Sequence, residues 1–236
     1  MKKVIHRAGT RGHSDHGWLD SYHTFSFADY HDPERIHFGA LRVLNDDTVA
    51  GGEGFGAHPH DNMEIVSIPL EGELRHQDSM GHTSVLRTGE IQVMTAGTGI
   101  IHSEFNNSPD RPVKFLQIWV FPDRRGLPTR YEEITLAPAR TNELRTIVAP
   151  EGNGSEHTAW THQSAWFHTL NLEKDTYEYA MRREGNGLYV FVLEGDVTVE
   201  NEKLASRDGM GIWEQNDITL HTDGKASLLL IEVPMR

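Results

Sequence analysis

Residues 68–78, IPLEGELRHQD, combine an apolar run, a Leu-Glu-Gly turn and a second alternating run, and this stretch decides the fold class. Successive side chains of a β-strand face opposite sides, so the two runs predict a hairpin. Residues 191–201, FVLEGDVTVEN, have the same order. A looser match relates GEIQVMTA (89–96) to GMGIWEQ (209–215), with the spacing from the turn shorter by three residues in the second half. The repeat predicts a duplicated β-domain.

The other apolar segments also have the pattern of strands. In residues 113–121, VKFLQIWVF, odd-numbered side chains face one way and even-numbered side chains the other, which predicts a central strand buried on nearly both faces. Similar short runs cover residues 39–44, 63–70, 73–78, 90–96, 188–194 and 227–233. Many short strands between turn signals predict an all-β sandwich or barrel with few, short helices.

Composition excludes several classes of protein. The net charge of −13 opposes binding to nucleic acid or to an anionic membrane surface through general electrostatics. The chain has no cysteine, so any metal must be held by nitrogen and oxygen atoms. The first residues lack the apolar run of a secretory signal, and no stretch has the ~18 apolar residues of a membrane helix. We therefore expect a cytoplasmic protein that contacts neither membrane nor nucleic acid.

Two pairs of side chains could form a metal site. His58 and His60 in GFGAHPHDNME are two residues apart, so they share one face of a strand, and Pro59 places them at a strand end or edge. His102 and Glu104 in GTGIIHSEFN have the same spacing. Either pair alone is also explained by a turn or a solvated strand face. Together they offer three imidazoles and a carboxylate, which suit Fe(II), Mn, Ni, Cu or Zn rather than Ca or Mg.

The same residues carry a family resemblance. GFGAHPHDNMEIVSIPLEG (54–72) and GEIQVMTAGTGIIHSEFN (89–106) resemble the two metal-binding motifs of the cupin superfamily, and more specifically those of the pirin family. The pirin marks are His-Pro-His followed by Glu, and Gly-x-Gly-Ile-x-His-Ser-Glu. HTFSFADY (23–30) is also similar to pirins. The resemblance is strong over residues 10–135 and weak over the rest, and the sequence looks close to bacterial pirins of the type with quercetin 2,3-dioxygenase activity.

The resemblance implies a set of site residues. By matching position, the metal ligands are His58, His60, His102 and Glu104, and Glu104 is also the catalytic base. One divalent transition metal is implied, Fe(II) first, with Mn, Ni, Cu, Co or Zn as alternatives. Glu64 stands where many cupins have a glutamate ligand, but in pirins the carboxylate comes from the second motif. Glu64 is therefore expected to be a neighbour of the ligands or a structural residue.

The resemblance also implies the domain organisation. Pirins have two tandem cupin domains, which are jelly-roll-like β-barrels, and only the first holds a metal. We expect an N-terminal cupin domain over residues 1–125 and a linker over 126–145. The C-terminal cupin domain over 146–236 is expected to have a degenerate site, and its last strands could pack across the domains. His221 falls near the place that corresponds to His102 but lacks partner ligands, so a structural role is expected for it.

The function that the resemblance implies is a metal-dependent dioxygenase. It would open the central ring of a flavonol such as quercetin with O₂ and release CO, acting as a monomer on a small flavonol-like molecule. One alternative is a pirin-type regulatory protein that senses metal or redox state and binds a protein partner. The other is a cupin enzyme with a different small-molecule substrate. His23 and His76 are either partners of a ligand, parts of a pocket wall or half-buried strand histidines.

Overall fold

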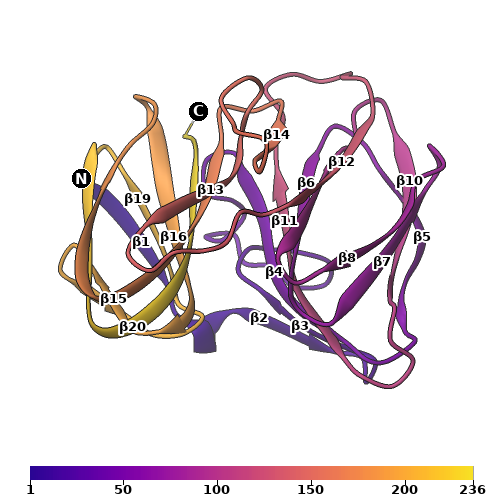
Figure 1. Cartoon of the computed structure of the whole chain (residues 1–236), viewed down its shortest axis with the longest axis horizontal. Helices are drawn as coiled ribbons and strands as arrows, with labels where there is room; N and C mark the ends of the chain where they lie inside the picture. Colours follow the sequence, from indigo (N-terminus) through magenta and orange to yellow (C-terminus); the bar gives the residue numbers. More distant parts are fainter. Residues whose placement is uncertain (236) are drawn as a thin grey trace.

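Two β-barrels lie side by side in the computed structural model, which describes residues 1–235 (Figure 1). Among these residues the only helical element is a short 3₁₀ turn, η1 (Ala8–Thr10), and all other regular elements are strands. The prediction of an all-β chain is confirmed. In the described part of the chain, no helix has the length and apolar character that crossing a membrane requires.

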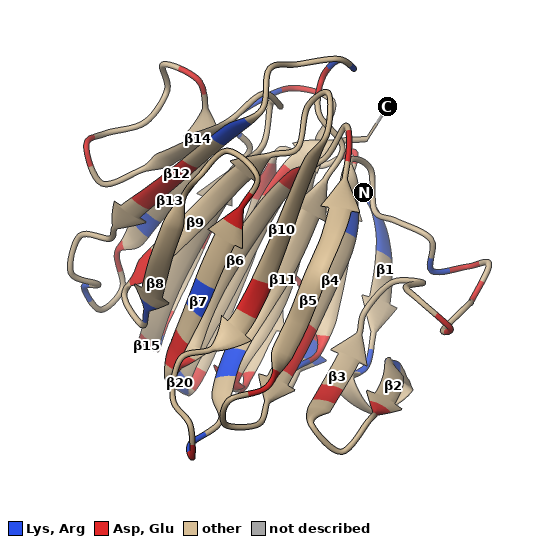
Figure 2. Cartoon of the chain, turned by 90° about the vertical axis from the view of Figure 1, so that its right-hand side faces the viewer, with Lys and Arg blue, Asp and Glu red and all other residues tan. Residues whose placement is uncertain are grey.

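The N-terminal barrel is made of two facing sheets. The larger sheet has the order β12-β9-β6-β11-β4-β3-β2, and the smaller has the order β5-β10-β7-β8, which lies across the front of Figure 2. The strands of the larger sheet are β2 (Gly12–Asp15), β3 (Leu19–His23), β4 (Leu41–Val49), β6 (Glu64–Glu71), β9 (Glu90–Thr95), β11 (Val113–Val120) and β12 (Arg130–Thr135). The strands of the smaller sheet are β5 (Gly54–His60), β7 (Glu73–Asp78), β8 (Thr83–Arg87) and β10 (Ile100–Asn106).

The C-terminal barrel is one curled sheet with the order β1-β19-β16-β20-β15-β13-β14, extended by β17 and β18. Its strands are β1 (Lys2–His6), β13 (Leu144–Pro150), β14 (Ala159–Thr161), β15 (Trp166–Ala180), β16 (Asn186–Gly195), β17 (Val197–Val199), β18 (Glu202–Leu204), β19 (Gly209–Trp213) and β20 (Asp217–Pro234). The first strand of the chain therefore pairs, antiparallel, with β19 of the second half. Conversely, β12 lies within residues 126–145, which we expected to be a linker, and pairs with β9 of the N-terminal barrel.

The two Leu-Glu-Gly turns of the sequence repeat have the same backbone conformation. Gly72 and Gly195 have φ values of +80° and +79°, in the left-handed region that glycine adopts without strain. A Cβ at Gly195 would also collide with the carbonyl oxygen of Lys225 in the neighbouring strand. The repeat therefore reflects the same turn in both barrels, at the end of β6 in one and of β16 in the other.

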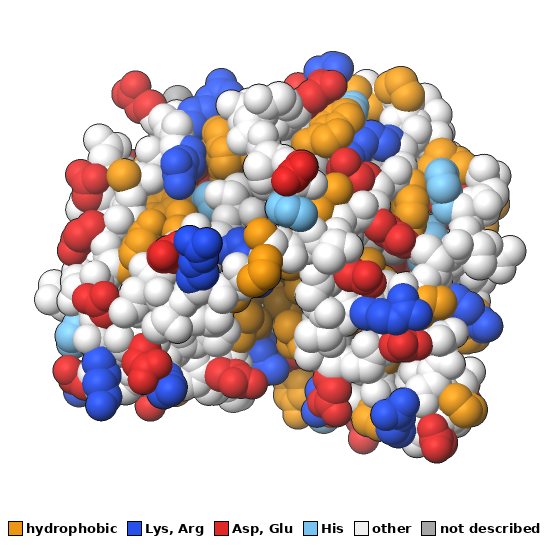
Figure 3. All heavy atoms as spheres, viewed as in Figure 1, with side chains coloured by type: hydrophobic (Ala, Val, Ile, Leu, Met, Phe, Trp, Pro, Cys, Tyr) orange, Lys and Arg blue, Asp and Glu red, His pale blue; other side chains and the backbone are white. Residues whose placement is uncertain are grey.

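One apolar core joins the two barrels. Leu116 and Ile118 of β11 face the C-terminal barrel and belong to the same core cluster as Phe167, Leu229 and Ile231. The two faces of β11 are thus both covered, as the alternation in residues 113–121 predicts, because Phe115 on the other face packs inside the N-terminal barrel. Figure 3 shows apolar side chains in the seam between the halves, with charged side chains spread around them.

Glu64 lies on the interdomain face of the larger sheet. It pairs with Thr95 across β6 and β9, and the Thr95 hydroxyl donates a hydrogen bond of 3.0 Å to Glu64 Oε2. Burial raises the pKa of Glu64 from 4.5 to about 7, against the opposing effects of the Thr95 hydrogen bond and the positive charge of Arg130. A buried carboxyl that favours its neutral form makes stability depend on pH.

We expect Ile118→Ala to lower the free energy of unfolding by about 2–5 kcal/mol, because it leaves a cavity in the core shared by both barrels. Urea unfolding followed by tryptophan fluorescence and by circular dichroism measures this change. The matched control is Ile101→Ala, since Ile101 is 52% exposed and its truncation should change stability by about 0.5 kcal/mol or less. Equal effects of the two substitutions would contradict the assignment of Ile118 to a shared core.

We expect Glu64→Gln to remove a component of the pH dependence of stability. Between pH 4.5 and about 7 the folded chain keeps the Glu64 proton that the unfolded chain releases, so this group's contribution to stability falls as pH rises. The fall is at most about 1.4 kcal/mol per pH unit. Urea unfolding of chelator-treated wild type and variant at several pH values from 4 to 8 measures it. The expectation would be disproved if the difference in free energy of unfolding between wild type and variant stayed constant over this pH range.

Candidate metal centre

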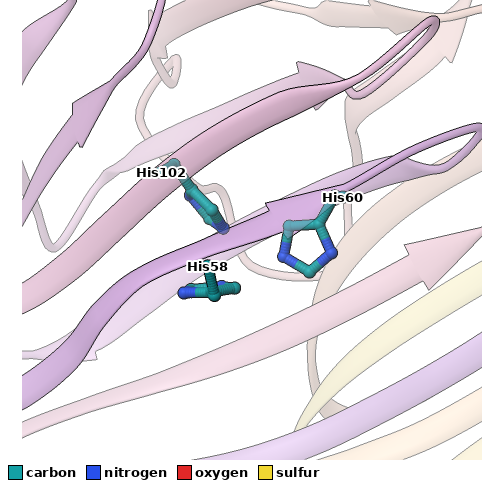
Figure 4. A group of neighbouring side chains, drawn as sticks. All are labelled: His58, His60 and His102. Atoms are coloured by element: carbon teal, nitrogen blue, oxygen red, sulfur yellow. The ribbon is translucent and has the colours of Figure 1, made fainter.

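The predicted histidines come together inside the N-terminal barrel. His58 and His60 lie on β5, at the edge of the smaller sheet, and His102 lies opposite His58 on β10. Figure 4 shows the three rings projecting from these two strands into a common space. The ring centroids of His102 lie 4.4 Å from His58 and 4.9 Å from His60, and His58 and His60 are 4.8 Å apart.

The free ring nitrogens of this cluster suit a cation. One potential ligand atom from each of the three histidines lies within 4.8 Å of the others. His102 Nε2 is buried and has no hydrogen-bond partner. A buried polar atom without a partner costs about 1–3 kcal/mol, which a bound metal would offset. At His58, Nδ1 lies 2.8 Å from the carbonyl oxygen of Gly56, so it carries the proton and leaves the lone pair on Nε2.

Burial keeps two of the imidazoles neutral over the physiological pH range. Burial, reinforced by the neighbouring imidazoles of His58 and His60, lowers the pKa of His102 to about 2. Burial, and then the charge of His58, lowers the pKa of His60 to about 4. Neutral imidazole is the form that binds metals, so His60 and His102 need not lose a proton first.

Glu104 supplies a carboxylate beside His102. Its Oε2 accepts a hydrogen bond of 2.9 Å from Gln117 Nε2, and its Oε1 lies 3.3 Å from the hydroxyl of Ser67. Both partners come from the facing sheet, so these bonds cross the barrel. Burial raises the pKa of Glu104 above its usual value, opposed by Gln117, His58 and Ser67. A ligand atom of Glu104 also lies within 4.8 Å of ligand atoms of His102 and His76.

A cavity of about 190 Å³ opens beside this cluster. His58, His60 and Glu104 line one part of it, and Phe55 and Trp119 line another. Trp119 stands edge-on to His60 with a centroid distance of 4.8 Å. The cavity thus combines potential ligand atoms with flat apolar walls, an arrangement typical of sites for small aromatic molecules.

A third part of the cavity wall is polar and, apart from His23, was not identified from the sequence. The Ser21 hydroxyl donates a hydrogen bond to the carboxyl of Asp47 and lies 2.8 Å from His23 Nε2. Asn45 lies beside them on β4. Burial raises the pKa of Asp47 to about 7, partly offset by the Ser21 hydrogen bond. His23 therefore belongs to the pocket wall, one of the alternatives that its sequence position left open.

The remaining candidates lie away from the cluster, with one exception. Glu64 faces the C-terminal barrel, on the opposite side of β6 from Ser67, so it is not a neighbour of the ligands. His221 binds the Thr176 hydroxyl and Asp223 on the outer part of the C-terminal barrel, in agreement with a structural role. The exception is His76, which lies next to His102. Among residues 1–235, groups that could hold a metal occur only in the N-terminal barrel.

Comparison with known proteins shows the family and the domains of the chain. The family model "Pirin" matches residues 4–120, and the model "Quercetinase C-terminal cupin domain" matches residues 146–233. These two matches confirm the prediction of tandem cupin domains. Quercetin 2,3-dioxygenase of Escherichia coli K12 is 39% identical over 230 residues, which cover 98% of each chain. The Mycobacterium tuberculosis H37Rv protein Rv0181c is 49% identical over 242 residues, covering 97% of this chain and 94% of that one.

A solved structure has the same architecture. Bacterial pirin YhhW from Escherichia coli, in complex with nickel(II), superposes with a TM-score of 0.92 at 37% identity and covers 99% of each chain. A quercetin 2,3-dioxygenase structure from Acinetobacter baumannii has a TM-score of 0.79 at 23% identity, which supports the fold alone. With relatives that match nearly its whole length and a family model that matches its metal-site half, the chain belongs to the pirin family.

Proposed function

We propose that His58, His60, His102 and Glu104 hold one divalent transition metal, with Fe(II) first and Mn, Ni, Cu, Co or Zn as alternatives. The unpaired Nε2 of His102 and the low pKa values of His60 and His102 support this set. Three nitrogen donors and one carboxylate match the preferences of these metals. The nickel(II) in the related YhhW structure supports a divalent metal without deciding which one is native.

We further propose that the chain is a flavonol dioxygenase that opens the central ring of a molecule such as quercetin with O₂ and releases CO. The observation that carries this proposal is the cavity in which His58, His60 and Glu104 adjoin aromatic walls. The name of the 39% identical Escherichia coli relative supports the same substrate class. A metal held by the four side chains would supply Lewis acidity, which lowers the pKa of a substrate hydroxyl bound to it.

The protein side chains have distinct tasks in this reaction. Glu104 accepts the hydroxyl proton, because its carboxyl group lines the cavity beside His58 and His60, within reach of a hydroxyl held at the metal. Gln117 Nε2 holds Glu104 Oε2 in place at 2.9 Å. Phe55 and Trp119 offer apolar surfaces against which the planar rings pack. The deprotonated, electron-rich substrate then reacts with O₂, which reaches it through the open side of the cavity.

We expect purified wild-type protein, with its native metal identified, to consume quercetin and O₂ and to release CO. His60→Ala should lose metal, and Glu104→Gln should lower kcat/KM by about 100-fold or more, since it removes the base. Metal analysis, loss of quercetin absorbance, an oxygen electrode and CO detection measure these outcomes.

Glu64→Gln is the matched control for Glu104→Gln. Both glutamates are buried, but Glu64 faces the C-terminal barrel, so its variant should retain wild-type turnover at a pH where it is folded. A fully metal-loaded wild type that turns over no flavonol would refute the dioxygenase proposal. That result would favour a sensing role or another substrate.

A further inference from the structure

A line of polar side chains extends from His102 in the direction away from its unpaired Nε2. His102 Nδ1 lies 3.5 Å from His76 Nδ1, and His76 Nε2 lies 3.3 Å from Asp78 Oδ2. Asp78 Oδ2 is also 2.8 Å from Nδ1 of His82, whose side chain is 43% exposed. His76 and Asp78 are buried. The line therefore runs from the candidate metal centre to the protein surface.

The carboxylate of Asp78 fixes the positions of the protons along this line. Its Oδ1 accepts the backbone N–H groups of Met80 and His82, at 2.9 and 3.0 Å. A carboxylate only accepts hydrogen bonds, so the two imidazole nitrogens facing Oδ2 must both carry protons. Burial pushes the pKa of Asp78 up, but the hydrogen bonds from His82, His76 and Met80 outweigh it and hold the pKa below its usual value.

The proton that His76 Nε2 donates to Asp78 determines which nitrogen of His102 has the lone pair. With its proton on Nε2, neutral His76 presents a lone pair at Nδ1. The facing Nδ1 of His102 must then be the donor, because two lone pairs would repel each other. Neutral His102 therefore has its own lone pair on Nε2, the buried atom without a partner. Each imidazole N–H in the line therefore points toward Asp78. His76 and His102 each have their lone pair on the nitrogen that faces the metal site.

Packing holds this line in place. The ring of Tyr131 stacks on His76 at a centroid distance of 4.6 Å and on His82 at 4.7 Å. The Tyr131 hydroxyl lies 2.6 Å from the hydroxyl of Ser84 on β8. The imidazole planes of His76 and His82 are inclined by 23° and 21° to this one aromatic ring from β12, and the stacking favours the ring orientations in which their nitrogen atoms face Asp78.

We propose that Asp78 is a positioning residue which, through His76, sets the tautomer and the orientation of His102 so that Nε2 faces the metal. This inference rests on the proposed metal site but not on the proposed substrate. A carboxylate that orients a metal-binding histidine through a hydrogen bond is a common support of metal sites, and its removal typically costs about 10–100-fold in metal affinity. Here the carboxylate acts across an intervening imidazole.

Asp78→Asn tests the proton positions directly. The backbone N–H groups require the amide oxygen at the place of Oδ1, so the amide NH₂ occupies the place of Oδ2 and faces His76. Neutral His76 must then accept at Nε2 and carry its proton on Nδ1, which forces the proton of His102 onto Nε2. We expect the Kd for Zn(II), measured by competition with a chromophoric chelator, to rise about 10–100-fold.

A pair of substitutions at His76 separates positioning from packing. Gln keeps an acceptor oxygen for His102, whereas Phe fills the space and can stack on Tyr131 but offers no acceptor. We expect His76→Gln to stay within about 5-fold of the wild-type Kd for Zn(II) and His76→Phe to weaken it by about 10–100-fold. Asp196→Asn, an exposed substitution in the C-terminal barrel, should leave the Kd unchanged. Circular dichroism and thermal unfolding verify that each variant is folded.

Nitrogen-15 NMR of the Zn(II)-loaded protein gives a readout that a purely structural role would not change. In the wild type we expect protons on Nδ1 of His102 and on Nε2 of His76. The inference is overturned if His76 carries its proton on Nδ1, if Asp78→Asn keeps the wild-type Kd, or if the Gln and Phe variants weaken binding equally. Absence of metal binding by the wild type would overturn the metal site as well. If the Kd values for Zn(II) follow the expected order but the wild type turns over no flavonol, the role of Asp78 is supported and only the dioxygenase proposal is contradicted.

Discussion

One face of the seven-stranded sheet lines the interior of the N-terminal barrel, and the other face packs against the C-terminal barrel. The rest of the structure depends on this constraint. On β11, Ile118 packs into the core shared with the C-terminal barrel, while Gln117 points into the N-terminal barrel and holds Glu104. Because side chains alternate with a period of two, a register shift of one residue would exchange these faces. The same register therefore fixes both the junction of the barrels and the position of the carboxylate.

Removal from water sets the chemistry of the site. Burial lowers the pKa of His60 and His102 and raises that of Glu104, so in each case it favours the uncharged form. Uncharged imidazoles bind a cation without competition from protons over the physiological range. A divalent cation would also compensate for the buried charge of an ionised Glu104. The barrel thus provides a place that is costly for an isolated charge but favourable for a paired one.

Strand alternation explains how much could be predicted from the sequence. The spacing of His58 with His60, and of His102 with Glu104, was sufficient to place each pair on one face of a strand. The same rule applied to residues 64–67 would have separated Glu64 from Ser67. Alternation cannot identify which strands are neighbours in space, because that depends on long-range pairing.

The pairing of strands distant in sequence accounts for what the sequence did not reveal. β1 joins the C-terminal barrel beside β19, and no local pattern in residues 2–6 distinguishes that partner from a nearer one. The polar cavity wall has the same origin, since Ser21 and Asp47 meet only where β3 pairs with β4. The spacing of His76 and Asp78 was visible in the sequence, but the proximity of His76 to His102 required the pairing of β7 with β10.

Within residues 1–235 the groups that could hold a metal lie in the N-terminal barrel, and a buried acid of the C-terminal barrel provides the contrast. The C-terminal barrel also contains a buried acid, Glu232, but four groups donate hydrogen bonds to its two oxygens, among them the Tyr179 hydroxyl and the Asn186 amide. A carboxylate satisfied in this way stabilises the strands around it and has no strong tendency to bind a cation. His102 Nε2 is equally buried and has no donor or acceptor to meet it. Burial alone therefore does not distinguish the two groups, and what suits His102 to a cation is an unpartnered Nε2 that lies beside two further imidazoles.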